Sequence, residues 1–216
     1  MLTLSGAENY FTGIVVLECR PIQAECINLF VASSAENRLQ YLPGFAGGAF
    51  TASRCGRYAL ELVCWSDPAA LAAARTSSVF LEHVTIVEHH TKRLHAGFSS
   101  RYETLCGMPV SLQRGDRIVF ALYKPPAAIA PEEVRERLLT TNDPVVARTL
   151  VHIAEDGSSL ALFSGDALSS TASAALTTAF GEPHYQGDFT VVETVNRSPN
   201  SVAYEPLYRV ALPTAS

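Results

Sequence analysis

The sequence predicts an α+β fold in which two tandem ferredoxin-like βαββαβ units form one pseudo-dimeric α/β barrel. The first observation is a repeat: Gly-Ile-Val-Val-Leu-Glu-Cys-Arg-Pro at 13–21 matches Arg-Ile-Val-Phe-Ala-Leu-Tyr-Lys-Pro at 117–125. The displacement, on the order of a hundred residues, is the size of one small domain. The second is that similar strand and helix patterns follow both copies. A four-stranded sheet with helices on one face leaves its other apolar face bare, and pairing two such sheets covers it.

The first unit begins with a strand and a helix. Residues 12–21 are rich in β-branched residues, and the strand stops at Pro21 because proline cannot donate to a ladder. Apolar residues at helical spacing then predict an amphipathic helix within 23–39. The Leu-Pro-Gly-Phe turn at 42–45 leads into the next extended run.

A hairpin and a second helix follow. We expect strands at 49–53 and 58–65, joined by a loop in which Gly56 supplies positive φ. Asp67 is a good N-cap for an alanine-rich helix at 69–75, because Pro68 suits the first helical position.

The end of the first unit is ambiguous. Periodicity permits either a strand or a helix around 84–90, but its counterpart in the repeat, 189–195, is rich in β-branched residues and favours a strand. Residues 99–105 are a further strand candidate, and the Tyr-containing segment at 207–209 echoes the one at 101–103.

The second unit repeats this order. The expected elements are a helix at 131–140, strands at 147–153 and 159–164 around a Glu-Asp-Gly turn, and a helix at 167–180. A boundary near 107–114 divides the chain into a site-bearing domain at 1–108 and a degenerate copy at 109–216.

The strand at 58–65 carries the sharpest local signal for a site. Alternate strand residues share a face, so Glu61 and the single tryptophan, Trp65, point the same way from an otherwise apolar strand. In the second copy Ala161 takes the place of Glu61, and the tryptophan position falls near Ser164 or Gly165. A tryptophan required by the fold should recur, so its loss favours a site in the first copy over a core tryptophan beside a solvated glutamate.

Composition excludes several classes of function. Apolar residues make up 48% of the chain, and the net charge is −5 with no basic block, which argues against nucleic acid as a partner. No apolar run approaches a membrane span, and the first ten residues lack the features of a signal peptide, so we expect a cytoplasmic protein that does not contact a membrane. The odd number of scattered cysteines, five, is typical of reduced thiols.

The Pro-Gly-Phe turn, the strand ending in Trp65, the Ser-Asp-Pro helix start and the Phe-Leu-Glu-His segment at 80–83 together resemble the antibiotic biosynthesis monooxygenase family. The resemblance covers 12–90 well and 116–195 weakly. A tandem member of this length is similar to the oxygenases of aromatic polyketide pathways, including those that open a ring of angucycline-type quinones.

The resemblance implies an oxygenase that uses O2 on a phenol or hydroquinone, giving a quinone or oxidative C–C ring opening, with no tightly bound cofactor or metal. It allows a reduced flavin (FADH2 or FMNH2) supplied from outside, a flavin reductase as partner, and a homodimer. The strand tryptophan of the family carries over to Trp65. The family often has asparagine where this chain has Glu61, and a buried Glu61 would serve as a base because burial raises a carboxyl pKa.

The other candidate residues are histidines and aromatic side chains. His83, His89 and His90 are candidates for acid–base catalysis or substrate contact, because imidazole titrates near neutral pH; structural or solvated histidines and a metal site are the alternatives. The expected substrate contacts are Phe45, Tyr58, Phe80 and Tyr102. A non-catalytic polyketide-binding or scaffold protein and a haem-degrading monooxygenase remain alternative functions.

Overall fold

The computed structural model describes residues 1–4, 10–20, 24–99, 102–104, 110–125, 129–140, 149–165 and 169–196. The first half contains β1 (Leu2–Leu4), β2 (Phe11–Cys19), α1 (Ala24–Asn37), the 3-10 turn η1 (Leu39–Tyr41), β3 (Phe45–Ser53), β4 (Tyr58–Trp65), α2 (Pro68–Ala74), α3 (Ser78–His90), β5 (Thr91–Ser99) and β6 (Tyr102–Thr104). The second half contains β7 (Val110–Leu112), β8 (Arg117–Tyr123), α4 (Pro131–Leu139), β9 (Leu150–Ile153), β10 (Leu160–Ser164), α6 (Ser170–Phe180) and β11 (Tyr185–Asn196).

Nine antiparallel strands form the main sheet in the order β5-β2-β4-β3-β11-β8-β10-β9-β6. The strands of the first unit lie in the order β5-β2-β4-β3, and those of the second unit in the equivalent order β11-β8-β10-β9. In each unit the strands that come first and third along the chain lie in the middle, as in a ferredoxin-like fold. The two ends of this order come together, because Nε2 of His152 on β9 lies 3.0 Å from the backbone oxygen of Thr12 on β2. The predicted tandem ferredoxin-like barrel is therefore confirmed.

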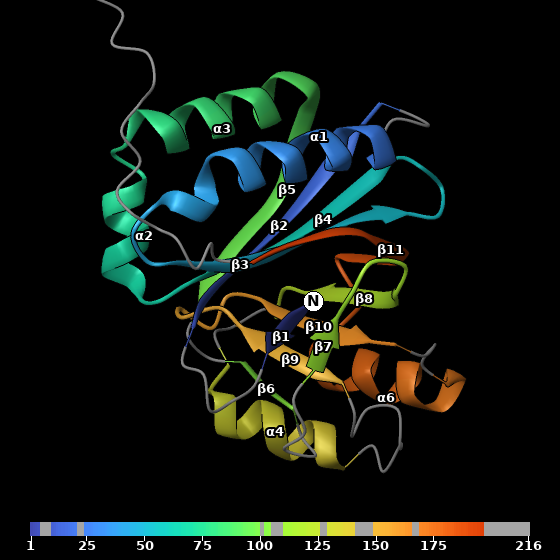
Figure 1. Ribbon diagram of the computed structural model, residues 1–216. Coiled ribbons are helices and arrows are strands. Elements are labelled where there is room, and N and C mark those ends of the chain that lie inside the picture. Colours follow the sequence, from blue (N-terminus) through green and yellow to red (C-terminus); the bar gives the residue numbers. More distant parts are fainter. Residues whose placement is uncertain are drawn as a thin grey trace, which may run out of the picture.

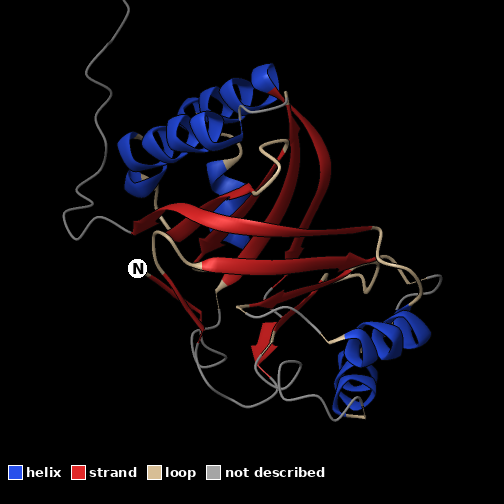
Figure 2. Cartoon of the chain, turned by 90° about the vertical axis from the view of Figure 1, so that its right-hand side faces the viewer, coloured by secondary structure: helices blue, strands red, loops and turns tan. Residues whose placement is uncertain are grey.

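Among the described residues, the buried apolar side chains form three clusters. Residues from both halves, among them Leu60, Leu62 and Phe120, form the cluster inside the barrel. The helices lie outside it in two groups, α1, α2 and α3 over the first unit and α4 and α6 over the second (Figures 1 and 2). The second group packs on the outward face of its own strands, whereas the first packs on its own strands and also on β11, through Val192 and Val195. The boundary predicted between 108 and 109 lies outside the described residues and stays a prediction.

The turn before β3 depends on a glycine. Gly44 has φ +79°, and a Cβ at this position would lie 2.3 Å from the Cβ of Ala70 in α2. Its carbonyl accepts a hydrogen bond from the backbone N–H of Ser66 at 2.7 Å. The Leu-Pro-Gly-Phe motif thus allows α2 to pack close to the start of β3, and this sets the end of β4 where Trp65 lies.

The segment at 84–90 is a helix, so the strand favoured by the sequence comparison is wrong. Ser77 caps α3, because its Oγ accepts from the backbone N–H of Phe80 at 3.2 Å. Phe80, Val84 and Val87 then fall at helical spacing on the side that faces the sheet. The strand equivalent to β11 is β5, which begins after this helix; residues 207–209, the proposed echo of 101–103, lie outside the described residues.

The expected equivalence of Ala161 with Glu61 is also wrong. Ala161 belongs to the cluster inside the barrel, whereas the side chain of Glu61 lies on the helix-covered face. In the ladders, Val15 pairs with Glu61, and Val119, its match in the repeat, pairs with Ser164. A shift of an odd number of residues reverses the face on which a strand residue lies. Ser164 therefore occupies the position of Glu61, and the second copy still lacks the carboxyl group.

Replacing Asp67 with alanine should lower the free energy of unfolding by about 1 kcal/mol. The Asp67 carboxylate caps α2 by accepting from the backbone N–H of Ala70 at 2.8 Å, as the sequence predicted. Urea denaturation measures the change. Asp67→Asn keeps an oxygen acceptor and serves as the matched control; equal losses in the two variants would contradict the capping role.

Candidate functional site

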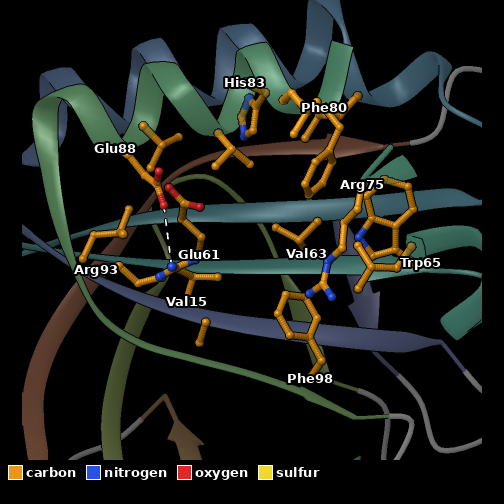
Figure 3. A pocket seen from close by; sticks show the side chains of 17 residues that line it. Val15, Glu61, Val63, Trp65, Arg75, Phe80, His83, Glu88, Arg93 and Phe98 are labelled. Atoms are coloured by element: carbon orange, nitrogen blue, oxygen red, sulfur yellow. Dashed lines mark ion pairs between the residues drawn. The ribbon is translucent and has the colours of Figure 1, made fainter. Parts of the chain in front are cut away.

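A cavity of about 380 Å³ lies between α3 and the outward face of the first unit's strands (Figure 3). This volume is within the range of small-molecule sites. Strands β2, β4 and β5 form its floor, and α3 with the end of α2 forms its roof and side. Its lining residues are Val15, Leu17, Leu39, Glu61, Val63, Trp65, Leu71, Arg75, Phe80, Leu81, His83, Val84, Val87, Glu88, Arg93, Ala96 and Phe98.

Glu61 is the buried carboxyl group of this cavity. Its residue is 4% exposed, and its Oε1 has no hydrogen-bond partner among the described residues. Burial disfavours the charged form and raises the pKa of Glu61 to about 8. At neutral pH the carboxyl group is therefore largely protonated, and once deprotonated it is a stronger base than an exposed glutamate.

Aromatic rings form one end of the cavity. Trp65 is fully buried and meets Phe80 at 6.1 Å and Phe45 at 5.6 Å between ring centroids, both edge to face. Trp65, a predicted catalytic residue, and Phe80, a predicted substrate contact, both line the cavity, and their roles stay predictions. Phe45 lies behind Trp65 and does not line the cavity, so it supports the indole.

His83 lies on α3 above Glu61 and Val63 (Figure 3). It is 5% exposed, and its Nδ1 lies 3.1 Å from the Oγ of Ser34 on α1. Burial, with the positive charge of Arg38, lowers the pKa of His83 to about 4. The imidazole is therefore neutral at physiological pH and can exchange a proton only through its second nitrogen, because Ser34 engages the first.

The cavity also contains charged residues that the sequence comparison missed. Arg93 forms an ion pair of 3.6 Å with Glu88 at one end, and the guanidinium of Arg75 lies 4.9 Å from the centre of the Phe98 ring at the other (Figure 3). Arg93 and Phe98 were missed because β5 was not predicted at 91–99. Arg75 ends the predicted alanine-rich helix, and that position alone did not indicate which way its side chain points.

The structure does not bring every predicted residue to this cavity. His89 and His90 are exposed and line a separate surface hollow with Arg57 and Lys92. Tyr58 lies on the opposite face of β4, where its ring meets Tyr185 at 5.0 Å. His89 and His90 are the last two residues of α3, where they are exposed and do not line the cavity. Tyr58 is three residues from Glu61, so it points to the opposite side of β4, because strand neighbours alternate. The side chain of Tyr102, in β6, lies outside what is described.

Two further observations concern metals and membranes. Over the described ranges, no three histidine, cysteine, aspartate or glutamate side chains gather as metal ligands. Likewise, none of the helices in the described part of the chain is long and apolar enough to cross a membrane. Within the residues that the structure describes, Cys19, Cys26, Cys55 and Cys64 are not joined in disulfides.

Replacing Glu61 with glutamine should change how stability depends on pH. The folded-state pKa of Glu61, about 8, exceeds its ordinary value of 4.5, so its contribution to stability is fully present below pH 4.5 and is lost as pH rises to about 8. The slope is about 1.4 kcal/mol per pH unit. His83 acts oppositely, because its lowered pKa removes stability as pH falls from 6.5 towards 4.

Urea denaturation of wild type and Glu61→Gln at pH 5, 6, 7 and 8 checks this prediction. The free energy of unfolding of the variant, relative to wild type, should rise by a few kcal/mol over this range. Parallel curves for the two proteins would show that Glu61 titrates normally.

Fold and cavity together define a class of protein: a single-chain α/β barrel of two ferredoxin-like units, with a cavity under the helices of the first unit. No protein-family model and no curated protein sequence matches the chain. Solved structures do match. The chain is similar to an anthrone oxidase-like protein, with a TM-score of 0.69 and 15% identity over 94% of this chain and 100% of that one.

Two other structures share the fold. A provisionally assigned monooxygenase from Fusobacterium nucleatum has a TM-score of 0.57 and 12% identity, over 88% of this chain and 95% of that one. A provisionally assigned chlorite dismutase has a TM-score of 0.52 and 12% identity, over 85% and 96%. Similarity at such low identity establishes the dimeric α/β-barrel type of fold, which hosts more than one chemistry.

Proposed function

We propose that this protein is an oxygenase that uses O2 on a polycyclic aromatic phenol, hydroquinone or anthrone, as found in aromatic polyketide biosynthesis. The observation that carries the proposal is the unpartnered, buried carboxyl group of Glu61 on the wall of a cavity whose other end is aromatic. A flat apolar ligand would pack against Trp65 and Phe80, and its acidic O–H or C–H would replace the missing partner of Glu61. The resemblance to oxidase-like and monooxygenase structures supports the same class of reaction.

In the proposed first step, the Glu61 carboxylate removes a proton from the substrate and leaves an electron-rich anion. Its pKa of about 8 suits this role, because a general base works best when its pKa lies near the working pH. Val15 and Val63 give the carboxylate apolar neighbours, and such low polarity strengthens a carboxylate as a base.

In the next proposed step, O2 takes its electrons from the substrate. The substrate anion gives one electron to O2, and the two radicals combine to form a C–O bond and a peroxide anion. Glu61 returns its proton to give the hydroperoxide. Loss of the remaining C–H proton with cleavage of the O–O bond gives the carbonyl of a quinone and one water, so each anthrone consumes one O2. His83, neutral and within the same cavity, is the candidate proton carrier for the last transfer.

An oxygen electrode tests the proposal with 1,8-dihydroxyanthrone as the probe. Catalysed uptake of one O2 per anthraquinone formed, above the rate of autoxidation in buffer and without added flavin, is the expected result. A second series with FMNH2 determines whether an external reductant is required. Uptake no faster than in buffer in either series would reject the oxygenase.

The two alternatives have their own readouts in this experiment. A binding or scaffold protein would quench the fluorescence of Trp65 with the same probe but would form no product. One observation favours the haem alternative. His83 lines the cavity, and its Nε2 atom makes no hydrogen bond to the described residues. If the protein binds haem, titration with hemin should shift the Soret band, and His83→Ala should abolish this shift.

A further inference from the structure

The aromatic end of the cavity holds a positive charge that the proposed reaction does not use. Arg75 follows the last residue of α2, and its guanidinium stacks over the ring of Phe98 at 4.9 Å. No acidic side chain of the described residues pairs with it, whereas Arg93, the other arginine of the cavity, is paired with Glu88. With Glu61 and His83 both neutral, the cavity has one positive charge in excess, although the whole chain has a net charge of −5.

A stack of groups holds this charge in position. Phe98 lies flat beside Phe11, with ring centroids 6.0 Å apart and planes 21° from parallel. It fits against β2 only because residue 13 is glycine: a Cβ there would lie 2.3 Å from Cε1 of Phe98. Gly13 therefore makes room for the ring, and the ring supports Arg75. A guanidinium stacked on an aromatic face keeps its N–H groups free in the plane for a carboxylate or phenolate.

Distance along β4 separates this charge from Glu61. Glu61 and Trp65 are four residues apart on one face of the strand, which corresponds to roughly 13 Å. Figure 3 shows Arg75 beside Trp65 and Phe98, at the opposite end of the cavity from Glu61 and the pair formed by Glu88 and Arg93. A ligand that reaches both groups is therefore long and flat, with two or three fused rings between them.

We propose that the substrate is an anionic polycycle whose carboxylate or acidic phenol binds Arg75 while the reacting ring lies at Glu61. This inference rests on the proposed function for the reacting end only. The alternative role of Arg75, stabilising the negative end of the α2 dipole, does not explain why its side chain lies over Phe98 at the cavity. Arg75 is exposed at the rim, so its effect should be screened by salt.

Ligand binding tests the inference without requiring turnover. The probes are anthraquinone-2-carboxylate and its neutral carboxamide, and the signal is quenching of Trp65, the single tryptophan. In wild type at low ionic strength, the carboxylate should bind about tenfold more tightly than the amide, as expected for one charge-assisted pair. Arg75→Gln should remove this preference, leave the affinity for the amide within twofold, and leave the melting temperature unchanged.

Two further variants complete the experiment: the first is a control, and the second tests the support that Phe98 gives to Arg75. Arg117→Gln removes an exposed arginine of the second unit that is paired with Asp188 and does not line the cavity, and it should keep the tenfold preference. Gly13→Ala, which displaces Phe98, should weaken it. Equal affinity of wild type for the two probes, no binding of either, or a preference that survives in Arg75→Gln overturns the inference. The oxygenase itself is judged separately, by O2 uptake with the uncharged anthrone.

Discussion

Glu61→Gln is expected to lower kcat/KM for anthrone oxidation by about 10² to 10⁴, the usual contribution of a positioned general base. Glutamine has nearly the same shape and keeps an oxygen at the cavity wall, but it cannot accept a proton. In wild type, kcat/KM should rise with pH and level off above about 8, because the pKa of Glu61 is raised to that value by burial. In the variant, this rise should disappear.

Steady-state O2 uptake between pH 6 and 9 measures both effects. Glu88→Gln is the matched control, since it removes a carboxylate that lines the same cavity but is exposed and paired with Arg93. Its kcat/KM should stay within a few-fold of wild type. An activity of Glu61→Gln within threefold of wild type, or the same pH profile in both proteins, would show that another group takes the proton.

Trp65→Ala is expected to lower the free energy of unfolding by about 3–5 kcal/mol, the range for removing a large buried aromatic side chain. Trp65 is fully buried, and its ring contacts with Phe45 and Phe80 join β4 to β3 and α3. Its removal would merge the space of the indole with the adjoining cavity. The variant should therefore lose rigidity at the aromatic end as well as stability.

Urea denaturation at pH 7 provides the measurement. Trp65→Phe keeps an aromatic ring and should lose clearly less stability than the alanine variant. Phe30→Ala is the control for aromatic truncation at the surface, because Phe30 is 52% exposed on α1; its cost should be within about 0.5 kcal/mol. A cost for Trp65→Ala as small as that of Phe30→Ala would mean that the indole is not part of the core.

Where the sequence comparison succeeded, the signal was local or periodic. The strand β4 has the predicted bounds, and Glu61, Val63 and Trp65 share one face of it because alternation along a strand is fixed by backbone geometry. Asp67 and Pro68 identified the start of α2 for the same kind of reason. The doubling of the unit was visible as well, since both first strands end in a basic residue followed by proline.

Where the prediction failed, the features that decided the structure lay outside the segment itself, in the cap before it and in the sheet against which it packs. The segment at 84–90 has β-branched residues that suit either state, and it is a helix because Ser77 caps it and because its apolar side lies over the sheet. Because 84–90 is helical, the last strand of the first unit is β5, which the sequence analysis did not predict. Arg93 and Phe98, which lie on β5, were therefore not recognised as site residues. A composition match between two copies is a poor guide to register when each copy packs against different neighbours.

The amino-acid sequence by itself determined the doubled ferredoxin-like unit and the shared face of Glu61 and Trp65, whereas the strand register was needed to identify Ser164 as the counterpart of Glu61. Only the tertiary structure decided that α3 covers this face and encloses a cavity, that His83 belongs to it while His89 and His90 do not, and that Arg75 lies at its far end. The physical reason is that side-chain direction along one element follows from the backbone, whereas enclosure, burial and the resulting pKa of Glu61 depend on elements brought together by packing.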